Sequence, residues 1–279
     1  MSHNTSLTNH NPTNYTKHAN FVYSAKYTSA VLDLLDPQPG ESVIDLGCGT
    51  GQVTEKIKAA VGDTGIVHGV DSSEEMNNSG GSISFSKADI QDYTTLDPAL
   101  KGKFDAVFSS ATFHWCKANP GGVVDTIKWL LKPGGRVAFE FGGFGNTVGI
   151  RAALHEVLRR RGVDPTVVDP WYFPTAKQYC TLLEQHGMAP GDVDLFPRPT
   201  PLPTDLVGWL TTFARKTFLS SYSQKDADEI MLEVSDLARP DAYWCSAAPG
   251  SGAKVPLAPS DEEGWEIMYV RLRGTATSK

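Results

Sequence analysis

The chain has 279 residues, enough to bury a sizeable core as one domain with at most a small appended lobe. Its 25 Lys and Arg residues against 32 Asp and Glu residues give a formal net charge of −7. This balance argues against a nucleic-acid partner, since phosphate binding needs a concentrated positive surface. The four cysteines include no C-x-x-C pair, which argues against a zinc site or a disulfide framework and favours a reducing compartment.

The predicted elements begin after a polar start. Residues 1–14 have neither the apolar core of a signal peptide nor an Arg-rich amphipathic pattern, so we expect a disordered leader there. No apolar run approaches the length of a membrane span, so a cytoplasmic location without a membrane partner is expected. Tyr15 opens an aromatic segment that leads into an amphipathic helix over 30–35, which the Pro- and Gly-containing stretch 36–40 ends.

Strand and helix patterns then alternate. Alternation of this kind predicts parallel strands with helices on both faces of the sheet. Between Asp71 and Ile83 the chain has room only for a shortened helix or an irregular segment. The predicted strands are 42–46, 65–70, 83–87, 104–109 and 136–141, and the predicted helices are 52–60 and 123–131.

After Gly142 the pattern changes. A Pro- and aromatic-rich stretch, 164–174, interrupts it, and the basic block 159–161 is expected on an exposed helical turn. We expect residues 15–145 to form a cofactor-binding core, and 146–279 to add the remaining core strands and a helical lid within the same domain. The predicted helices are 148–161, 176–186, 204–221 and 224–237, the predicted strands are 188–196 and 265–275, and 247–260 is a predicted surface loop.

The stretch 43–51 carries the clearest functional signal. An apolar run containing Asp45 is followed by Gly47, Gly49 and Gly51, and a helix pattern opens at Gln52. Glycines allow a tight strand-to-helix turn and let a ligand lie against bare backbone. The nicotinamide fingerprint would place its third glycine at Gln52, so the spacing favours another adenosine cofactor. Asp71 ends the next apolar run, where a carboxylate can accept hydrogen bonds from ribose hydroxyls.

These motifs resemble those of the class I S-adenosylmethionine-dependent methyltransferases: Asp45-x-Gly-x-Gly-x-Gly, then Asp71-Ser72-Ser73, then Lys87-Ala88-Asp89-Ile90. The stretches 104–115, 131–135, 140–143 and 170–174 are similar to the trans-aconitate methyltransferase-like branch, and the likeness covers 14–273. The resemblance implies an α/β fold, with a Rossmann-like seven-stranded, mostly parallel sheet, helices on both faces and a small helical lid or C-terminal insertion. It implies S-adenosylmethionine as cofactor, with S-adenosylhomocysteine as the product.

The resemblance also implies roles for single residues. The three glycines approach the methionine part of the cofactor, with the charge of Asp45 near its ammonium group. Asp71 binds the ribose diol, and Asp89 accepts the adenine amino hydrogen, although an isolated aspartate is more often a cap or turn residue. The N-terminal aromatic segment folds over the cofactor or packs on the sheet edge. The expected cofactor-binding set is Tyr15, Asp45, Gly47, Cys48, Gly49, Thr50, Gly51, Asp71, Ser72, Met76, Ala88, Asp89, Ile90, Ser109 and Ser110, the two serines lying beneath the methyl-bearing sulfur.

Two residues are catalytic candidates, His114 and Glu140. Methyl transfer is a direct displacement, in which an ionised carboxylate needs no general base while an alcohol, phenol or amine often does. His114 follows the fourth strand and can be a base, a hydrogen-bond donor or a buried structural residue. Glu140 lies in an apolar strand and must be paired or solvated, with Arg136, a C-terminal arginine or the substrate as alternative partners.

The expected acceptor-binding residues combine aromatic rings with groups that recognise anions. Trp209 and Phe213 lie four residues apart on a predicted helix, so they can equally be core residues. Tyr269, Arg271 and Arg273 share one face of the last strand, so one arginine can neutralise Glu140 instead of binding substrate. The expected set is Trp115, Trp171, Tyr172, Trp209, Tyr269 and Arg271, with Arg198, Arg273, Phe173 and Trp265 as further candidates.

These patterns predict an enzyme that methylates a small molecule, with carboxyl O-methylation of a small organic acid as the leading expectation. An N- or C-methyltransferase of a secondary metabolite is the alternative among enzymes. A non-catalytic partner subunit or sensor that keeps the cofactor pocket is the alternative of another class, because fold does not fix function. The sequence contains no His/Cys/Asp set at metal-ligand spacing, so no metal is expected, and a monomer is the default.

Overall fold

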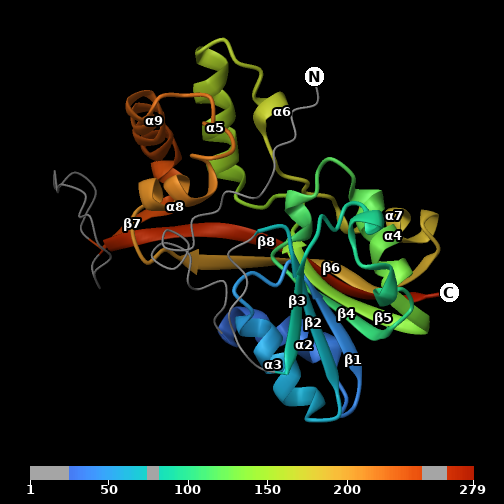
Figure 1. The fold of residues 1–279 in the computed structure, drawn as a ribbon. Helices are drawn as coiled ribbons and strands as arrows, with labels where there is room; N and C mark the ends of the chain where they lie inside the picture. Colours follow the sequence, from blue (N-terminus) through green and yellow to red (C-terminus); the bar gives the residue numbers. More distant parts are fainter. Residues whose placement is uncertain (1–24, 74–81, 247–262) are drawn as a thin grey trace. The chain divides into compact units, whose positions relative to one another are not determined.

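The computed structural model describes residues 25–73, 82–246 and 263–279 (Figure 1). The predictions for Tyr15, Met76, the leader 1–14 and the loop 247–260 lie outside these ranges. The helices are α2 (Ala25–Leu35), α3 (Gln52–Val61), α4 (Pro120–Leu130), α5 (Val148–Arg160), α6 (Pro165–Val168), α7 (Ala176–Gln185), α8 (Leu206–Phe213) and α9 (Gln224–Ala242). The strands are β1 (Ser42–Leu46), β2 (Ile66–Asp71), β3 (Ile83–Lys87), β4 (Phe104–Ser110), β5 (Leu131–Gly142), β6 (Met188–Pro201), β7 (Tyr243–Cys245) and β8 (Glu263–Ser278).

The chain divides into two compact units, which we describe separately. The sheet unit comprises the described residues up to 144 together with 171–196 and 271–279. The helical unit comprises 145–170 and the described residues of 197–270. Strands β6 and β8 each contribute residues to both units.

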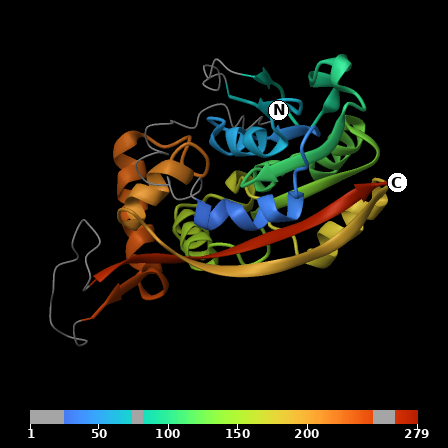
Figure 2. The ribbon, with the colours of Figure 1, turned by 90° about the horizontal axis from the view of Figure 1, so that it is seen from below.

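The main sheet has the order β3-β2-β1-β4-β5-β8-β6. The pairs β2–β3, β1–β2, β1–β4 and β4–β5 are parallel, whereas β5 and β8 are antiparallel. Figure 2 shows β8 in red beside β6 in amber at one edge. This arrangement confirms the predicted Rossmann-like, mostly parallel sheet. Its strand order reverses between β1 and β4, and ligands of open α/β sheets bind at the carboxyl ends of the strands at such a point.

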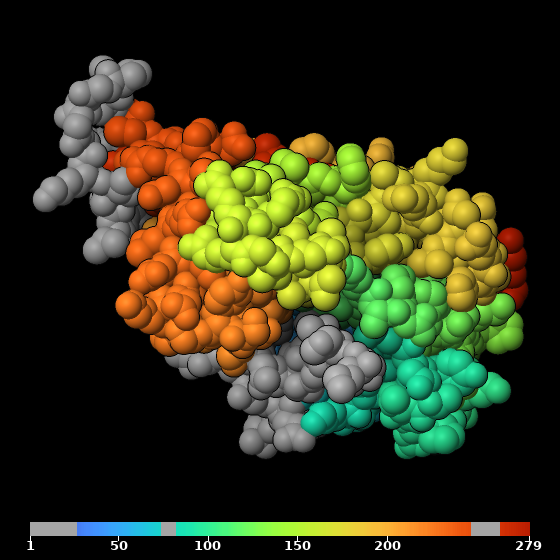
Figure 3. Space-filling view, turned by 90° about the horizontal axis from the view of Figure 1, so that it is seen from above, coloured from blue at the N-terminus to red at the C-terminus, as the bar shows by residue number. Residues whose placement is uncertain are grey.

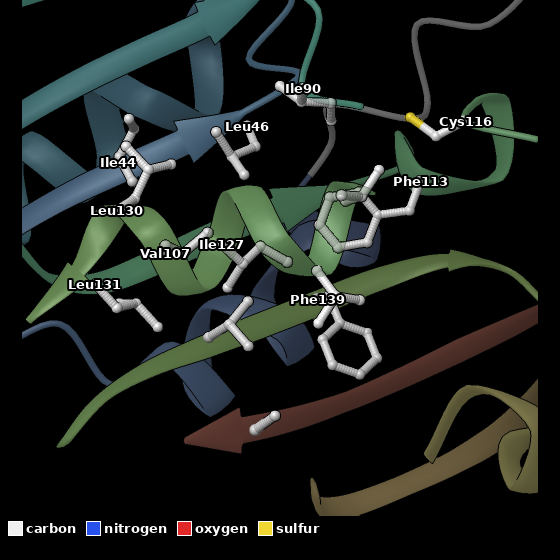
Figure 4. Close-up of a cluster of buried hydrophobic side chains, with 14 of the residues drawn as sticks. Ile44, Leu46, Ile90, Val107, Phe113, Cys116, Ile127, Leu130, Leu131 and Phe139 are labelled. Carbon is white, nitrogen blue, oxygen red and sulfur yellow. The ribbon is translucent and has the colours of Figure 1, made fainter. Parts of the chain in front are cut away.

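Both faces of this sheet are apolar because helices cover both. On one face Ile44, Val107 and Phe139 pack with Ile127 and Leu130 of α4 (Figure 4). On the other face the neighbouring strand residues Val43, Ala106 and Ala138 pack with side chains of α2 and α3. Each fully buried Leu, Ile or Phe contributes about 1.5–3 kcal/mol to folding. Burial on both sides explains why these strands read as continuous apolar runs rather than as alternating ones.

In the helical unit, ion pairs join α5 to α9. Arg160 and Arg161 lie 3.5 Å and 2.8 Å from the carboxylate of Glu233, so this part of the predicted basic block binds the neighbouring helix. Figure 3 shows the yellow-green side chains of α5 packed against the orange side chains of α9. At the other side of α5, the buried carboxylate of Asp169 binds Arg151 at 2.6 Å and His155 at 2.8 Å.

Several predicted boundaries are wrong. The helix predicted over 204–221 spans only Leu206–Phe213. Beyond it, the Arg215 amide donates to the Leu210 carbonyl at 3.0 Å and the Thr217 amide donates to the Ala214 carbonyl at 3.2 Å, so the i to i−4 bonding of an α-helix is lost. Helix α9 continues beyond 237 to Ala242, with Pro240 inside its last turns. Strands β6 and β8 extend beyond the predicted 188–196 and 265–275, and no sequence signal marks those ends.

Candidate active site

The three glycines of the β1–α3 turn all adopt positive φ, at 77° for Gly47, 54° for Gly49 and 81° for Gly51. A residue with a Cβ rarely adopts this conformation. The Gly47 amide donates to the carbonyl of Val70 at 2.7 Å, which closes the turn against the end of β2. Helix α3 then starts directly after Gly51. The sequence therefore builds a tight strand-to-helix turn, in which the side chains of Thr112 and Phe85 pack close to Gly47 and Gly51.

Asp71 lies at this turn, as its position after an apolar run predicted. Its Oδ2 accepts the Gly49 amide at 3.1 Å, and its Oδ1 accepts the Ser73 amide at 3.0 Å. Burial raises the pKa of this carboxyl group. A carboxylate oxygen that accepts one such bond keeps further acceptor capacity. The predicted role of Asp71 in ribose binding is compatible with this geometry.

Asp45 and Cys48 are both buried beside the turn. Asp45 is 2% exposed, and Thr54 Oγ1 of α3 donates to its Oδ2 at 2.7 Å. Burial raises the pKa of Asp45 to about 7. A Cβ built on Gly69 would lie 2.5 Å from the sulfur of Cys48, so this side chain fills the space that Gly69 leaves. Burial raises the pKa of the Cys48 thiol, which keeps it protonated and inert.

Asp89 follows β3 on an exposed turn. Its Oδ1 accepts the Gln91 amide at 3.0 Å and Gln91 Nε2 at 3.2 Å, so this carboxylate stabilises the turn. Its neighbours Ala88 and Ile90 are buried, and the Ala88 amide donates to the Asp71 carbonyl at 3.0 Å. The adenine role of this segment stays a prediction.

The end of β4 is hydrogen-bonded to both neighbouring strands, β1 and β5. Ser109 Oγ donates to the Leu46 carbonyl at 2.7 Å, so this buried hydroxyl is bound to β1. The predicted place of Ser109 and Ser110 beneath the sulfur stays a prediction. Ala111 has a positive φ of 59°, and its amide donates to the carbonyl of Glu140 at 2.7 Å. A non-glycine residue in this conformation is a strained position of a kind found at functional sites.

His114 belongs to the 3-10 helix η5 (Phe113–Trp115), which follows β4. Its ring is buried, and its Nδ1 accepts the backbone amide of Gly142 at 3.3 Å. An Nδ1 that accepts a hydrogen bond carries no proton, so the neutral ring has its proton on Nε2. The geometry therefore favours a hydrogen-bond donor or structural role over that of a base acting through Nε2.

The Pro- and aromatic-rich segment lies against this 3-10 helix. The Tyr172 amide donates to the His114 carbonyl at 2.8 Å. The rings of Trp171 and Phe173 stack at 5.5 Å between centroids, and Trp115 meets Trp171 edge-on at 6.1 Å. The fold thus brings together four of the predicted site residues, His114, Trp115, Trp171 and Tyr172, although 55 residues lie between Trp115 and Trp171 in the chain.

Glu140 is 2% exposed and is held by two arginines of β8. Arg273 Nε lies 2.7 Å from its Oε2, and Arg271 Nε lies 3.3 Å from its Oε1. The antiparallel register places Arg273 directly opposite Glu140. Of the partners that the sequence left open, Arg136 is wrong, because it binds Glu41 at 2.7 Å. The C-terminal arginines are the partners of Glu140.

Comparison with known proteins agrees with this site. Residues 44–139 match the model of a methyltransferase domain. The chain is 29% identical over 220 residues to an uncharacterized methyltransferase of Schizosaccharomyces pombe, covering 76% of this chain and 83% of that one. Residues 44–139 therefore form a methyltransferase domain of the kind that uses S-adenosylmethionine. A trans-aconitate 2-methyltransferase of Streptomyces avermitilis is 31% identical over 146 residues, 47% of this chain and 50% of that protein.

The solved structures agree on the fold. A protein of Bacillus halodurans C-125 assigned as a methyltransferase superposes with a TM-score of 0.58 at 14% identity, covering 90% of this chain and 98% of that chain. The positive φ of Gly47, Gly49 and Gly51 is compatible with the predicted role of this turn in cofactor binding, which stays a prediction. A Cβ on Gly51 would lie only 3.1 Å from the ring of Phe85.

Two of the predicted acceptor residues lie in the helical unit. Trp209 Nε1 donates to the Tyr269 hydroxyl at 2.7 Å, and both side chains are buried. Arg198 lies over the Tyr269 ring, 5.7 Å from its centroid. Phe213 packs on Trp209 at 4.9 Å and is buried, as the core alternative predicted. Arg271 belongs to the sheet unit.

Sequence reasoning missed two residues that hold the site, Thr54 and Thr112. Thr54 lies nine residues after Asp45, on the first turn of α3, and this spacing could have indicated the contact. Thr112 reaches the glycine turn only because β1 and β4 are neighbours, which no local pattern shows. In the described part of the chain, no group of three His, Cys, Asp or Glu side chains could hold a metal ion. Among the helices within those ranges, none has the length and hydropathy to cross a membrane.

Proposed function

We propose that this methyltransferase transfers a methyl group to a carboxylate oxygen of a small organic acid. S-adenosylmethionine, when bound, supplies that methyl group on a positively charged sulfur. The protein must hold an acceptor oxygen in line with the methyl group and exclude water from the line of attack. A carboxylate is already ionised near pH 7, so the protein needs no base to activate it.

The observation that carries the proposal is the way His114 is held. Its Nδ1 accepts the Gly142 amide, so the neutral ring donates from Nε2 and does not take up a proton there. A donor of this kind suits an anionic acceptor, whereas an alcohol or a phenol would call for a base. Beside His114, the ring of Trp115 packs edge-on against the buried ring of Trp171, and aromatic rings of this kind are common in small-ligand pockets.

The buried charges of the sheet unit support the same acceptor class. Two guanidinium groups, those of Arg271 and Arg273, bind the single carboxylate of Glu140. The group lies next to the end of β4, since the Glu140 carbonyl accepts the Ala111 amide. A buried positive potential attracts anions more strongly than an exposed one, because the local dielectric is lower. The similarity to a protein named for trans-aconitate, a tricarboxylic acid, also favours this class.

The proposal is tested with a panel of small di- and tricarboxylic acids, each paired with its neutral amide and alcohol. Formation of S-adenosylhomocysteine and of the methyl ester is measured for each compound. The panel includes trans-aconitate. We expect a methyl ester from at least one of the acids, and no methylated product from the amide or the alcohol of that acid. Equal methylation of the neutral compounds would contradict the proposal and favour N- or C-methylation. Cofactor binding without any turnover would favour a non-catalytic subunit.

A further inference from the structure

Two hydroxyl groups from the β4 end hold successive carbonyls of the β1–α3 turn. Ser109 Oγ donates to the Leu46 carbonyl at 2.7 Å. Thr112 Oγ1 lies 3.3 Å from the Gly47 carbonyl and 3.1 Å from the Ser110 carbonyl. Because the Gly47 amide is bound to β2 through Val70, the Gly47 residue is fixed at both its amide and its carbonyl.

Thr112 also touches the bare α-carbon of Gly47. A Cβ built on Gly47 would lie 2.1 Å from Thr112 Oγ1, 2.2 Å from its Cγ2 and 2.6 Å from its Cβ. The threonine side chain therefore occupies the volume that any other residue at position 47 would need. The Thr112 side chain therefore limits how closely the glycine turn can approach the end of β4, and its hydroxyl group holds the turn at that distance.

The same residue starts the segment that carries the predicted acceptor residues. The Trp115 amide donates to the Thr112 carbonyl at 2.9 Å, which forms η5 and places His114 within it. The preceding residue, Ala111, is held in its left-handed conformation by the Glu140 carbonyl. Thr112 thus lies between the cofactor-binding turn on one side and His114 and Trp115 on the other.

We propose that Thr112 is a positioning residue of methyl transfer, which sets the distance between the glycine turn and the His114–Trp115 segment. Displacement reactions depend steeply on alignment, and a misplacement of about 1 Å can lower a rate by about 100-fold. The inference rests on the methyltransferase activity and on the position of the cofactor at the turn. It does not depend on which acceptor is methylated.

Three variants separate the hydroxyl from the packing. Thr112→Val keeps the shape and removes the hydrogen bonds, Thr112→Ala removes both, and Thr112→Ser keeps the hydroxyl. The matched control is Thr126→Val in α4, because Thr126 is fully buried and its Oγ1 has no hydrogen-bond partner. Each protein is studied by NMR with bound S-adenosyl-[methyl-13C]methionine, by calorimetry with S-adenosylhomocysteine and by thermal unfolding.

We expect Thr112→Val and Thr112→Ala to shift the resonance of the bound methyl group while affinity for S-adenosylhomocysteine changes less than about threefold. Thr112→Ser and Thr126→Val should keep the wild-type resonance. With an acid that the panel shows to be methylated, Thr112→Val should lower kcat at least about tenfold and leave KM for the cofactor nearly unchanged. If Thr112→Val does not fold, the methyl resonances of Thr112→Ala and Thr112→Ser are compared instead.

An unchanged methyl resonance in Thr112→Val and Thr112→Ala would overturn the inference, as would a serine variant that behaves like the alanine variant. An equal shift in Thr126→Val would show a general effect of core changes and would overturn it too. The NMR measurement needs no acceptor. A failure of the carboxylate proposal therefore appears as absent ester formation alone, with the resonance shift of Thr112→Val still present.

Discussion

The hydroxyl of Thr54 donates to the carboxyl group of Asp45 across 2.7 Å, with Asp45 only 2% exposed. This one bond links the first turn of α3 to the strand that leads into the glycine turn. Burial outweighs the hydrogen bond and raises the pKa of Asp45 from 3.8 to about 7. In the unliganded protein the carboxyl group is therefore half protonated near neutral pH.

The first prediction concerns pH. A cationic cofactor favours the ionised form of Asp45, so its affinity should rise with pH and level off above about 7. Below that point affinity should fall by up to about tenfold per pH unit. Calorimetry with S-adenosylmethionine at a series of pH values from about 5.5 to about 8.5 measures this dependence. In Asp45→Asn the affinity should depend much less on pH. A wild-type profile already flat across the range would contradict it.

The same raised pKa makes the stability of the unliganded protein fall with rising pH, opposite to the trend in cofactor affinity. The folded pKa of about 7 lies above the unfolded value of 3.8, so folding binds a proton between these limits. The contribution of Asp45 to stability is complete below 3.8 and is lost as the pH rises toward about 7. Saturating cofactor should reduce or reverse this trend in thermal unfolding, and Asp45→Asn should remove it.

The second prediction concerns the ribose assignment. Asp71→Ala should weaken binding of S-adenosylhomocysteine by about 10- to 100-fold, because it loses paired hydrogen bonds to a charged acceptor and also releases the Gly49 amide. Asp92→Ala is the matched control, since this exposed carboxylate caps a 3-10 turn through the Thr94 amide. Titration calorimetry measures both. Equal affinities of the two variants would rule out Asp71 as a ribose ligand.

The glycine turn and Asp71 could be predicted because their signals are local. Gly47, Gly49, Gly51 and Asp71 each lie at the end of an apolar run, and the strand-to-helix turn follows from that pattern alone. The contacts of Thr112 could not be predicted in the same way, and for Glu140 the sequence left a C-terminal arginine as one of three alternative partners. They depend on which strands become neighbours, and for Arg273 on the antiparallel register of a strand more than 130 residues away.

The ends of some helices and strands could not be predicted from the sequence either. The helix predicted over 204–221 shows the pattern of apolar residues that a longer helix would have, yet it ends at Phe213. Side-chain donors there bind backbone carbonyls, as Arg215 Nη1 does with the Leu219 carbonyl at 2.9 Å. Periodicity describes the buried face of a helix and carries little information about this competition for carbonyls.

The third prediction concerns the buried ion pairs of the sheet unit. Glu140→Gln leaves the Arg271 and Arg273 guanidinium groups without their carboxylate, so the free energy of unfolding should fall by about 3 kcal/mol. Glu41→Gln is the control, since its pair with Arg136 is more exposed and should cost about 1 kcal/mol. Urea unfolding measures both. A smaller loss for Glu140→Gln than for Glu41→Gln would contradict the assigned network.

The fourth prediction concerns the hydrogen bond between Trp209 and Tyr269 in the helical unit. Tyr269→Phe should lower the free energy of unfolding by about 1 kcal/mol, since a buried donor loses its acceptor. Adding Trp209→Phe to this variant should cost less than Trp209→Phe costs in the wild type, because the bond is already absent. A double-mutant cycle by chemical unfolding measures the coupling. Strict additivity would show that the bond contributes nothing to stability.

The central claim is that the methyl group moves from the cofactor to a carboxylate oxygen. It is tested most directly by incubating the protein with S-adenosyl-[methyl-13C]methionine and trans-aconitate, as one member of the acid panel, and locating the label by NMR and mass spectrometry. For a methylated acid we expect the label in a methyl ester, one equivalent of S-adenosylhomocysteine per ester, and release of labelled methanol on mild alkaline hydrolysis. A label on carbon or nitrogen that survives hydrolysis would contradict the claim, and so would cofactor binding with no labelled product from any acid.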